Sequence, residues 1–502
     1  MATALGDDRK RRGQAAKYGM LRSDLNEIQG DLLRGMQKKA ELFLFFTIAD
    51  AARFKAVARE YVVGLLTHGG TVQERERMVA ARRRGSGSGS GSGEMPWLGM
   101  NLGFSKDGLT RLLGPNRPRM DPAFERGADD PETIAALNDP APSKWLRSFL
   151  SDRIDGVFLI AGPDKFFVTS HGNTLRARLG SAIKAVYSEI GAVRPGRERR
   201  HEHFGFLDGI SQPGIRGLTP VSRPSAAPEQ GLPGQDLIWA GEFVLGHPGQ
   251  DPRDPVKPGP IAPLPAPWAK NGSYMVFRRL EQRVPEFRAF VAAQAARLGM
   301  YPELLAARMV GRWKSGAPLE LAPLRDNAAL GPDENRNNDF EFGDDPFQRK
   351  CPYAAHIRKA YPRDDTGNEA EVQRHRIIRA GITFGPEVEP GETTTRHSRG
   401  LMFVSYQTSI ERQFEFIQRK YSNNLDFVGG KTRPGGGAVT PGFDPIIGQA
   451  PGGGAREMDE PYPNYPAGNR RTTLDMPNQF VVLTAAGYFF VPSITALRTV
   501  LT

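Results

Sequence analysis

One acidic residue, Asp208, stands between two glycines at the end of an apolar run, in the sequence Gly205-Phe206-Leu207-Asp208-Gly209. Glycine has no Cβ atom, so the backbone on either side of the acid can adopt unusual φ angles and can come close to a bulky group. The pattern suits an acid that faces a large ligand. The alternative is a strand that ends in a turn, with Asp208 as an ordinary turn residue.

Two further residues have contexts that suit a binding site. His356 follows two alanines, which leaves room for a large group to approach its imidazole. Arg379 stands near the start of an apolar strand and is followed by small residues, so its side chain could point into a pocket. A satisfied core or surface histidine and a surface arginine on an edge strand are the alternatives, and these local features leave both open.

Other catalytic patterns are weak or missing in the sequence. Among the eight histidines, His201 and His203 would share one face of a strand and could bind a metal there; two surface histidines in a basic stretch are the alternative. No Gly-x-Ser-x-Gly elbow, no Gly-x-Gly-x-x-Gly after a strand and no P-loop occurs. The single cysteine, Cys351, excludes an intramolecular disulfide and a thiolate metal cluster.

The composition indicates a chain that can bury a substantial core, with 502 residues of which 39% are hydrophobic. No apolar run approaches the roughly 20 residues that span a bilayer, and the polar N-terminus lacks the apolar stretch of a signal peptide. The net charge is +11, but aromatic residues do not interleave with the basic runs. We therefore expect no membrane and no nucleic-acid partner, and a cytoplasmic location.

Strand-like and helix-like stretches alternate in the first half of the chain. The order β-α-β, β-α-β predicts a four-stranded antiparallel sheet with helices on one face, which is a ferredoxin-like unit. The expected strands are 41–49, 97–104, 155–161 and 202–206, and the expected helices are 51–61, 106–113 and 172–190.

The second half repeats this order, so the predicted fold class is α+β with two ferredoxin-like modules. The expected strands are 274–277, 376–384 and 400–406 with a closing strand pair in 480–491, and the expected helices are 284–298 and 410–421. The predicted divisions are a disordered basic tail at 1–23, an N-terminal module at 24–215 with a Gly-Ser linker at 85–93, a proline-rich crossing at 216–270 and a C-terminal module at 271–502.

Several motifs in the same order resemble the dye-decolorizing peroxidases, and the resemblance is closest to the fungal-type and long bacterial members. The Gly-x-x-Asp-Gly pattern alone is weak, but the ordered set is specific and extends from about residue 24 to the C-terminus. Besides Gly205–Gly209, the set includes Asn26–Asp31, Gly311–Pro318, Cys351–Lys359, Arg379–Gly385, Arg399–Gln407 and Tyr488–Ser493.

The resemblance implies a dimeric α+β barrel-like fold whose C-terminal half binds most of a haem b (iron protoporphyrin IX). It makes His356 the proximal ligand of the iron, with Asp444 as a partner of that histidine. Asp208 becomes the distal acid–base residue and Arg379 the distal arginine. Leu401 and Phe403, which are same-face neighbours on one strand, would line the haem pocket.

The implied activity is that of a haem peroxidase. It would use hydrogen peroxide to oxidise dyes and phenolic or other aromatic compounds through a ferryl-oxo porphyrin-radical intermediate, with Asp208 and Arg379 assisting O–O heterolysis. The alternative is a haem-binding protein with little peroxidase turnover, such as a haem carrier or a deferrochelatase-like protein. An aspartate as distal base predicts activity at acidic pH, because a carboxyl of ordinary pKa near roughly 3.9 stays ionised where a histidine is protonated. A monomer or a homo-oligomer is expected.

Two positions bear on bulky substrates. Fungal members of the family have a surface tryptophan where this chain has Tyr421, so Tyr421 is a candidate surface radical site. They have a tyrosine where this chain has Phe384, which cannot act as an easily oxidised phenol. This departure makes high activity on bulky substrates doubtful, and simple packing is the alternative role of Tyr421.

Overall fold

The computed structural model describes residues 20, 22–36, 38–85, 97–223, 229–461 and 473–502. Most of the basic tail expected at 1–23, and all of the Gly-Ser linker after Gly85, lie outside the described residues. Within the described part of the chain, no helix is both long and apolar enough to cross a membrane.

The N-terminal half contributes four antiparallel strands, in the order β4–β1–β3–β2 across the sheet. Side chains of β1 alternate between two cores: Leu42 and Leu44 face the helices, whereas Phe43 and Phe45 face the other side of the sheet. The strands are β1 (Ala40–Ile48), β2 (Gly99–Phe104), β3 (Gly156–Gly162) and β4 (Ile183–Ala192).

The C-terminal half repeats this arrangement in the order β10–β12–β9–β15, with β11 also paired to β12. Both halves therefore have the strand order 4-1-3-2 of a ferredoxin-like unit, which confirms the predicted fold class. The strands are β9 (Ser273–Gln282), β10 (Ile378–Arg379), β11 (Ile382–Phe384), β12 (Gly400–Gln407) and β15 (Val481–Val491), with a separate hairpin of β13 (Arg456–Asp459) and β14 (Thr473–Met476).

The two half-sheets join into one curved sheet whose ends meet. On one side, β15 and β2 are joined by the pair Phe490–Phe104. On the other side, β4 lies against β11, where the hydroxyl of Thr383 donates to the carbonyl of Ala192 at 2.7 Å. Large apolar side chains fill the interior. The result is an α+β barrel built from two similar halves.

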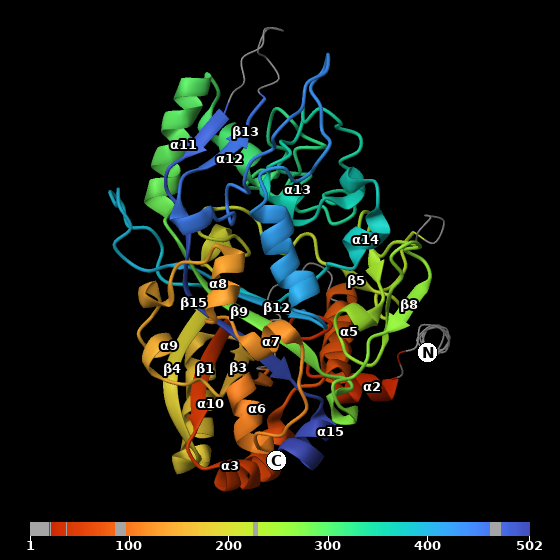
Figure 1. Cartoon of the computed structure of the whole chain (residues 1–502), viewed down its shortest axis with the longest axis vertical. Helices are drawn as coiled ribbons and strands as arrows, with labels where there is room; N and C mark the ends of the chain where they lie inside the picture. The colour runs from red at the N-terminus through yellow and green to blue at the C-terminus, as the bar shows by residue number, and fades with distance from the viewer. Residues whose placement is uncertain (1–19, 21, 37, 86–96, 224–228, 462–472) are drawn as a thin grey trace.

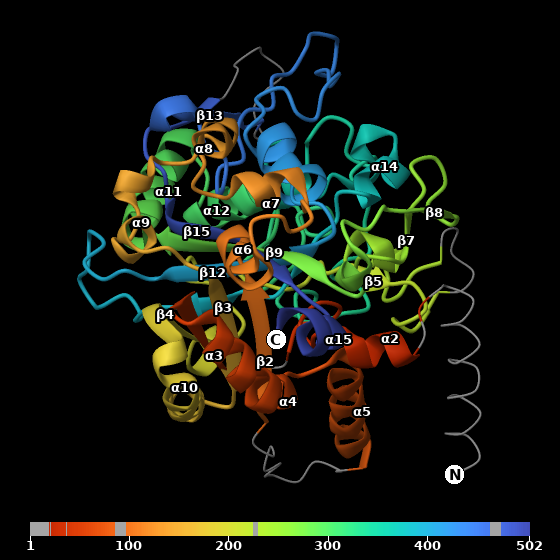
Figure 2. The ribbon, with the colours of Figure 1, turned by 60° about the horizontal axis from the view of Figure 1, so that its bottom comes forward.

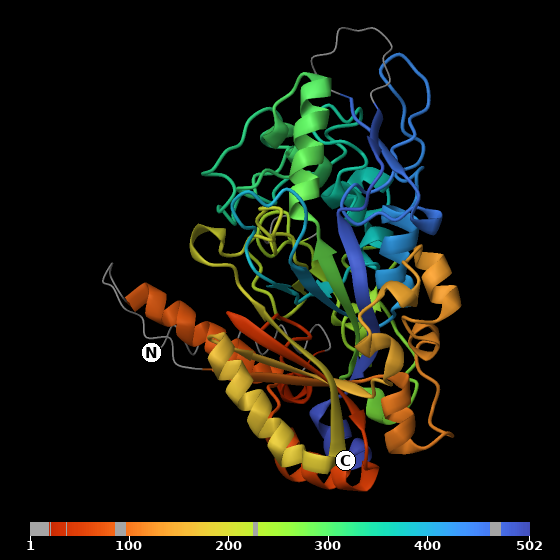
Figure 3. The same cartoon turned by 90° about the vertical axis from the view of Figure 1, so that its left-hand side faces the viewer.

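Helices cover the outside of the barrel in two groups. In Figure 1, α3, α6, α10 and α15 gather at one end of the molecule and α11 and α12 at the other, and Figure 3 shows α10 lying along the N-terminal strands.

The helices of the N-terminal half are α2 (Arg22–Glu27), α3 (Ala51–Val57), α4 (Val63–Leu65), α5 (Gly69–Gly85), α6 (Lys106–Leu113), α7 (Pro122–Arg126), α8 (Pro131–Leu137), α9 (Ser148–Ser151) and α10 (Lys165–Leu179). Those of the C-terminal half are α11 (Val284–Leu298), α12 (Pro302–Val310), α13 (His356–Ala360), α14 (Glu369–Gln373) and α15 (Ile494–Ala496). The same half has three short π-helices, η8 (Glu411–Glu415), η9 (Ile417–Ser422) and η11 (Leu497–Leu501).

The last helix returns to the start of the described chain. Helix α15 lies beside α2 (Figure 2), and the backbone N–H of Thr495 donates to the carboxylate of Glu27 at 2.8 Å. The C-terminal segment therefore packs on the N-terminal half of the barrel.

The proline-rich segment between the halves forms short strands. Proline lacks a backbone N–H and cannot continue a helix, so the segment folds as small two-stranded sheets. They pair β5 (Gly214–Ile215) with β6 (Leu237–Ile238) and β7 (Pro248–Gln250) with β8 (Pro258–Ile261). The module boundaries 24–215, 216–270 and 271–502 stay predictions.

The expected strand at 202–206 is wrong. The fourth strand of the N-terminal half is β4, and the preceding helix α10 ends at Leu179 instead of continuing to Ile190. Gly180 adopts a positive φ of 52°, which ends the helix. Residues 202–206 instead form a turn. The flanking residues His201 and Leu207 pair as an isolated antiparallel bridge, so the chain reverses direction between them.

The expected strand pair at 480–491 is also wrong, because these residues form one strand. β15 pairs with β9 from Val481 to Val491 and follows its curvature through a bulge between Leu483 and Ala485. The bulge explains the error, since it interrupts the alternation that marks a single strand.

Gln29 links the two half-sheets where β2 and β15 meet. Its buried side chain accepts a hydrogen bond from the N–H of Leu102 at 2.8 Å and donates to the carbonyls of Leu102 at 3.0 Å and Pro492 at 2.8 Å. A side-chain amide offers both a donor and an acceptor, so it can satisfy backbone groups of two strands at once. The glutamine of the motif Asn26–Asp31 therefore has a structural role at this junction.

Gln29→Ala should destabilise the protein by about 3 kcal/mol, because it leaves buried backbone groups without partners and each such group costs about 1–3 kcal/mol. Urea unfolding of the haem-loaded protein, followed by circular dichroism, would measure the change. Gln294→Ala is the matched control and should change the midpoint little, because the side chain of this half-buried residue of α11 accepts from exposed Arg297 and, among the described residues, bonds to no strand. A loss below about 1 kcal/mol for Gln29→Ala would mean that the barrel junction does not depend on the amide.

Candidate functional site

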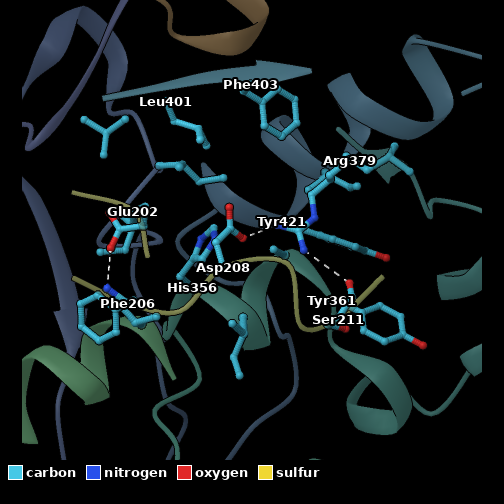
Figure 4. Close-up of a pocket in the computed structure, with 18 of the residues that line it drawn as sticks. Glu202, Phe206, Asp208, Ser211, His356, Tyr361, Arg379, Leu401, Phe403 and Tyr421 are labelled. Carbon is cyan, nitrogen blue, oxygen red and sulfur yellow. Dashed lines mark hydrogen bonds and ion pairs between the residues drawn. The ribbon is translucent and has the colours of Figure 1, made fainter. Parts of the chain in front are cut away.

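A cavity of ≈ 290 Å³ lies against the outer face of the C-terminal half-sheet. Its volume is near the lower end of the range for small-molecule and cofactor sites. Leu401 and Phe403 of β12 face this cavity (Figure 4), whereas Met402 and Val404 between and beyond them point into the barrel core. The two-residue period of the strand therefore places Leu401 and Phe403 on one apolar wall.

His356 begins helix α13 and lines the cavity. Its Nδ1 atom lies 2.8 Å from Oδ2 of Asp444, whose other oxygen accepts the N–H groups of Ile446 at 2.8 Å and Ile447 at 3.0 Å. Burial opposes the charge on the imidazole, but the Asp444 carboxylate outweighs burial and raises the pKa of His356. Because Nδ1 is engaged, Nε2 is the nitrogen left to bind a ligand in the cavity.

Asp208 and Arg379 meet in the same cavity although 171 residues separate them in the chain. Arg379 Nη1 lies 3.2 Å from Asp208 Oδ1, and the two side chains are 33% and 41% exposed. Gly205 and Gly209 adopt φ angles of +99° and +79°, which disfavour any residue with a Cβ atom. The glycines therefore shape the loop that carries the acid to Arg379 in the cavity.

Four further arginines line the cavity and are themselves buried: Arg278, which is paired with Asp139, and Arg312, Arg363 and Arg376. Burial, reinforced by the charge of Arg363, lowers the pKa of Arg312 to about 9, and burial lowers the pKa of Arg376 to about 10. The hydrogen bonds that Arg312 and Arg363 make to described residues go to carbonyl and amide oxygens. Arginine keeps its proton at working pH, so this wall has positive charge available for an anionic ligand.

Tyr421 is not at the surface, which corrects the expectation of a surface radical site. It lies on η9, is 6% exposed and lines the cavity. Its ring stacks on Phe427 at a centroid distance of 4.1 Å and meets Phe416 edge-on, and burial raises the pKa of its hydroxyl. The packing of these aromatic rings, which come from neighbouring turns and a following loop, removes the residue from solvent.

Phe384 is buried beneath a guanidinium group. The Arg279 group lies 4.0 Å from the centre of the Phe384 ring, and Arg279 is itself paired with Glu189. A cation over the ring face is a favourable contact for the resting side chain. It therefore gives Phe384 a packing role at this position.

His201 and His203 do not form a metal site. His203 is buried, and its Nε2 atom lies 2.8 Å from the carbonyl oxygen of Phe384, whereas Nδ1 of His201 lies 3.1 Å from the carbonyl oxygen of Arg199. The two residues are not on a strand, so they do not share a face. Among the described residues, no group of three or more His, Cys, Asp or Glu side chains is placed to hold a metal ion.

The structure thus brings six of the predicted site residues to one cavity, which are Asp208, His356, Arg379, Leu401, Phe403 and Tyr421, with Asp444 directly behind the histidine. The sequence patterns considered above do not predict the arginine-rich wall. The close spacing of Arg376 and Arg379 in one apolar stretch is the sequence feature that could have indicated a shared site. No local sequence feature indicates that Arg312 and Arg363 belong to the same site. Their common position depends on loops that fold over the half-sheet.

Two family models match the chain. Residues 27–195 match the "DyP dimeric alpha+beta barrel domain", and residues 261–440 match "Dyp-type peroxidase, C-terminal". The first match covers the N-terminal half of the barrel and the second covers His356 and Arg379.

Individual relatives match over nearly the full chain. The dye-decolorizing peroxidase msp1 of Mycetinis scorodonius is 37% identical over 497 residues, which is 95% of this chain and 88% of the relative. A dye-decolorizing peroxidase of Exidia glandulosa is 39% identical over 95% of this chain and 87% of its own length. The multifunctional dye peroxidase DyP2 of Amycolatopsis sp. is 30% identical over 94% of this chain and 95% of its own length.

Solved structures agree with these matches. The fold superimposes on an ancestral D-type dye decolorizing peroxidase with a TM-score of 0.82 and 38% identity, over 95% of this chain and 99% of that one. A dye-decolorizing peroxidase in complex with 2,6-dimethoxyphenol gives a TM-score of 0.79 and 35% identity over the same shares. These similarities agree with the barrel of two similar halves and with the residues gathered in the cavity on its outer face. The chain belongs to the dye-decolorizing peroxidase family of haem peroxidases.

Proposed function

We propose that the protein uses hydrogen peroxide to oxidise dyes and phenolic or other aromatic compounds, with Asp208 and Arg379 acting on peroxide and His356 holding the iron. The observation that carries the proposal is the meeting of these three side chains in one cavity. A related peroxidase structure contains 2,6-dimethoxyphenol, which supports a phenolic reductant for this chain.

The cofactor that we propose is haem b. The residues present fit it, because the cavity combines an apolar wall, a histidine with one free nitrogen and an arginine-rich wall suited to two carboxylates. Leu401 and Phe403 would contact the apolar ring, and Arg312, Arg363 and Arg376 would pair with its propionates. When bound, haem would supply an iron centre that accepts a peroxide oxygen and two oxidising equivalents.

Asp444 would act through His356. A carboxylate bonded to Nδ1 sets the tautomer, so that Nε2 carries the lone pair for the iron, and makes the imidazole a stronger donor. The two backbone N–H groups on the other oxygen of Asp444 keep that carboxylate ionised and fix its orientation. Burial disfavours the charge on Asp444, yet His356 and these N–H groups lower its pKa.

Asp208 would move the proton that peroxide cleavage requires. Its carboxylate would take a proton from the peroxide oxygen that faces the iron. It would then give this proton to the other peroxide oxygen, which leaves as water. Arg379 Nη1, which lies 3.2 Å from Asp208 Oδ1, would orient peroxide and stabilise negative charge on the departing oxygen. Leu401 and Phe403 would exclude water from this side of the cavity.

An absorption spectrum of the purified, haem-loaded protein tests the proposal. We expect a Soret band that changes on addition of one equivalent of hydrogen peroxide and returns after two equivalents of a one-electron reductant. A Soret band that does not respond to peroxide would instead support a haem-binding protein with little turnover. Lack of any Soret band after reconstitution would exclude both functions.

Tyr421 is proposed to pass electrons between reductants that cannot enter the cavity and the bound cofactor. Its ring lines the cavity and stacks on the ring of Phe427, which is partly exposed, so the two rings connect the cavity with the surface. Tyr421→Phe should lower turnover of an anthraquinone dye severalfold and leave 2,6-dimethoxyphenol turnover unchanged, since phenylalanine fills the space but is hard to oxidise. Steady-state assays of both substrates would measure this, and an unchanged dye rate would remove Tyr421 from the proposal.

Hydrogen peroxide and an aromatic reductant are the partners that this function requires. A monomeric or homo-oligomeric state and a cytoplasmic location stay predictions from the sequence.

A further inference from the structure

We propose that Gln212 is a positioning residue that sets the place of Arg379 relative to Asp208, an inference that rests on the proposed function. The backbone of Arg379 needs such support. Its strand, β10, is two residues long and lies at one end of the sheet order. The N–H of Ala380 donates to the carbonyl of Val404 in β12 at 2.9 Å. In an antiparallel sheet the backbone groups of successive residues point alternately toward and away from the neighbouring strand, so the N–H and C=O of Arg379 point away from β12.

Gln212 satisfies both of these groups. The N–H of Arg379 donates to Oε1 of Gln212 at 3.2 Å, and Nε2 of Gln212 donates to the carbonyl of Arg379. One side-chain amide thus takes the place of a further strand beside β10. Aspartate, glutamate or a hydroxyl could not do this in the same way, because the site needs one donor and one acceptor at the spacing of an amide.

The same residue belongs to the loop that carries the acid. Gln212 follows Asp208 by four positions, and its own carbonyl accepts from Nε2 of Gln235 at 3.1 Å, which ties the loop to the proline-rich segment. Arg379 Nη2 also approaches the carbonyl of Ser211 at 3.5 Å. The loop that carries Asp208 therefore holds the backbone of Arg379 as well as facing its side chain.

The ion pair is too weak to set this geometry alone. Both side chains are partly exposed in the cavity, and pairs of that kind contribute only about 0–1 kcal/mol. The two hydrogen bonds between the Gln212 amide and the backbone of Arg379 form a backbone clamp. They act on the main chain, so they restrict where the guanidinium can reach. Positioning of this precision matters for rate, since a misplacement of about 1 Å can cost a factor of about 10².

The test is a double-mutant cycle on the haem-loaded enzyme. Gln212→Met keeps the length of the side chain and removes the amide, and Arg379→Leu removes the group that the clamp positions. The measurement is the second-order rate constant for the reaction with hydrogen peroxide, followed at the Soret band in a stopped-flow instrument. The affinity of the resting enzyme for cyanide is a second readout that does not involve turnover, and Gln294→Met on α11 is the matched control.

We expect Gln212→Met to lower the peroxide rate constant by about 10² in the wild-type background and by less than about threefold in the Arg379→Leu background. The apparent KM for peroxide should rise while the turnover at saturating peroxide stays close to wild type. Cyanide affinity should fall with Gln212→Met in the wild-type background alone. If Gln212→Met fails to bind haem, Gln212→Asn, which keeps an amide one methylene shorter, enters the same cycle.

Equal losses in both backgrounds would overturn the inference, because they would indicate general damage to the fold. An unchanged rate in Gln212→Met, with a slow Arg379→Leu enzyme, would also overturn it and leave the proposed function intact. An unchanged rate in Arg379→Leu would instead overturn the role of Arg379 in the proposed function, and the inference with it.

Discussion

Asp208→Asn is expected to lower the rate constant for the reaction of the haem-loaded enzyme with hydrogen peroxide by about 10²–10⁴, which is the usual contribution of a positioned acid–base group. Asparagine has nearly the same shape, and its oxygen can still accept the N–H of Gly209, which lies 2.6 Å from Asp208 Oδ1, so the loop should keep its conformation. What the variant loses is the ability to take up a proton. Stopped-flow absorption at the Soret band would measure the rate.

The matched control is Asp107→Asn, at the exposed start of α6 and remote from the cavity. It should react with peroxide at the wild-type rate. A loss of less than about tenfold in Asp208→Asn would assign the proton transfer to another group in the cavity. Because the ion pair of Asp208 with Arg379 is partly exposed, its loss alone should change the stability of the protein by less than about 1 kcal/mol.

His356→Ala should abolish peroxidase activity and leave the protein unable to retain haem through purification. The substitution removes the nitrogen proposed to bind the iron and leaves the buried Asp444 carboxylate without the imidazole that bonds to it. Absorption spectra of the purified variant, with the haem content per chain, would measure the effect. Imidazole added together with haem can enter the space that the side chain vacates, so it should restore part of the Soret band.

Asp444→Asn keeps His356, the proposed iron ligand, and removes the carboxylate that bonds to its imidazole. The amide oxygen can still accept from the N–H groups of Ile446 and Ile447, but asparagine offers no charge to the imidazole. We expect haem to bind and peroxidase activity to fall by about 10–100-fold, as is usual when the partner of a metal-binding histidine is removed. His397→Ala, at an exposed position, is the control for both variants. An unaltered Soret band in His356→Ala would show that another residue binds the iron.

Much of the local structure could be predicted from the sequence because it depends on periodicity and on capping residues. Helix α6, Lys106–Leu113, and helix α11, Val284–Leu298, have the predicted bounds. Ser105 accepts the N–H of Gly108 at the start of α6, and a glycine in a left-handed conformation follows α11. These signals act within a few residues, so they do not need the rest of the fold.

The errors arose where local patterns compete. The stretch 183–192 is mostly half-buried and forms a strand, but the predicted helix 172–190 extends over most of it. Residues 202–206 have aromatic content typical of a strand, yet they turn because the Glu202 carboxylate accepts the N–H groups of Phe204 at 2.9 Å and Phe206 at 2.8 Å. A side chain that bonds to backbone in this way replaces the ladder of a sheet, and hydrophobic pattern alone does not reveal it.

By itself, the sequence determined the family, the repeated order of strands and helices, and the three residues proposed to carry the chemistry, because motif order and apolar periodicity are properties of the linear chain. Only the tertiary structure decided how the sheet closes into a barrel, that Tyr421 is buried, and that four additional arginines share the cavity with Asp208 and His356. It also decided that Gln212 bonds to the backbone of Arg379. The physical reason is that each of these features depends on contacts between segments far apart in the chain, where burial and the pairing of backbone groups are set by the whole fold.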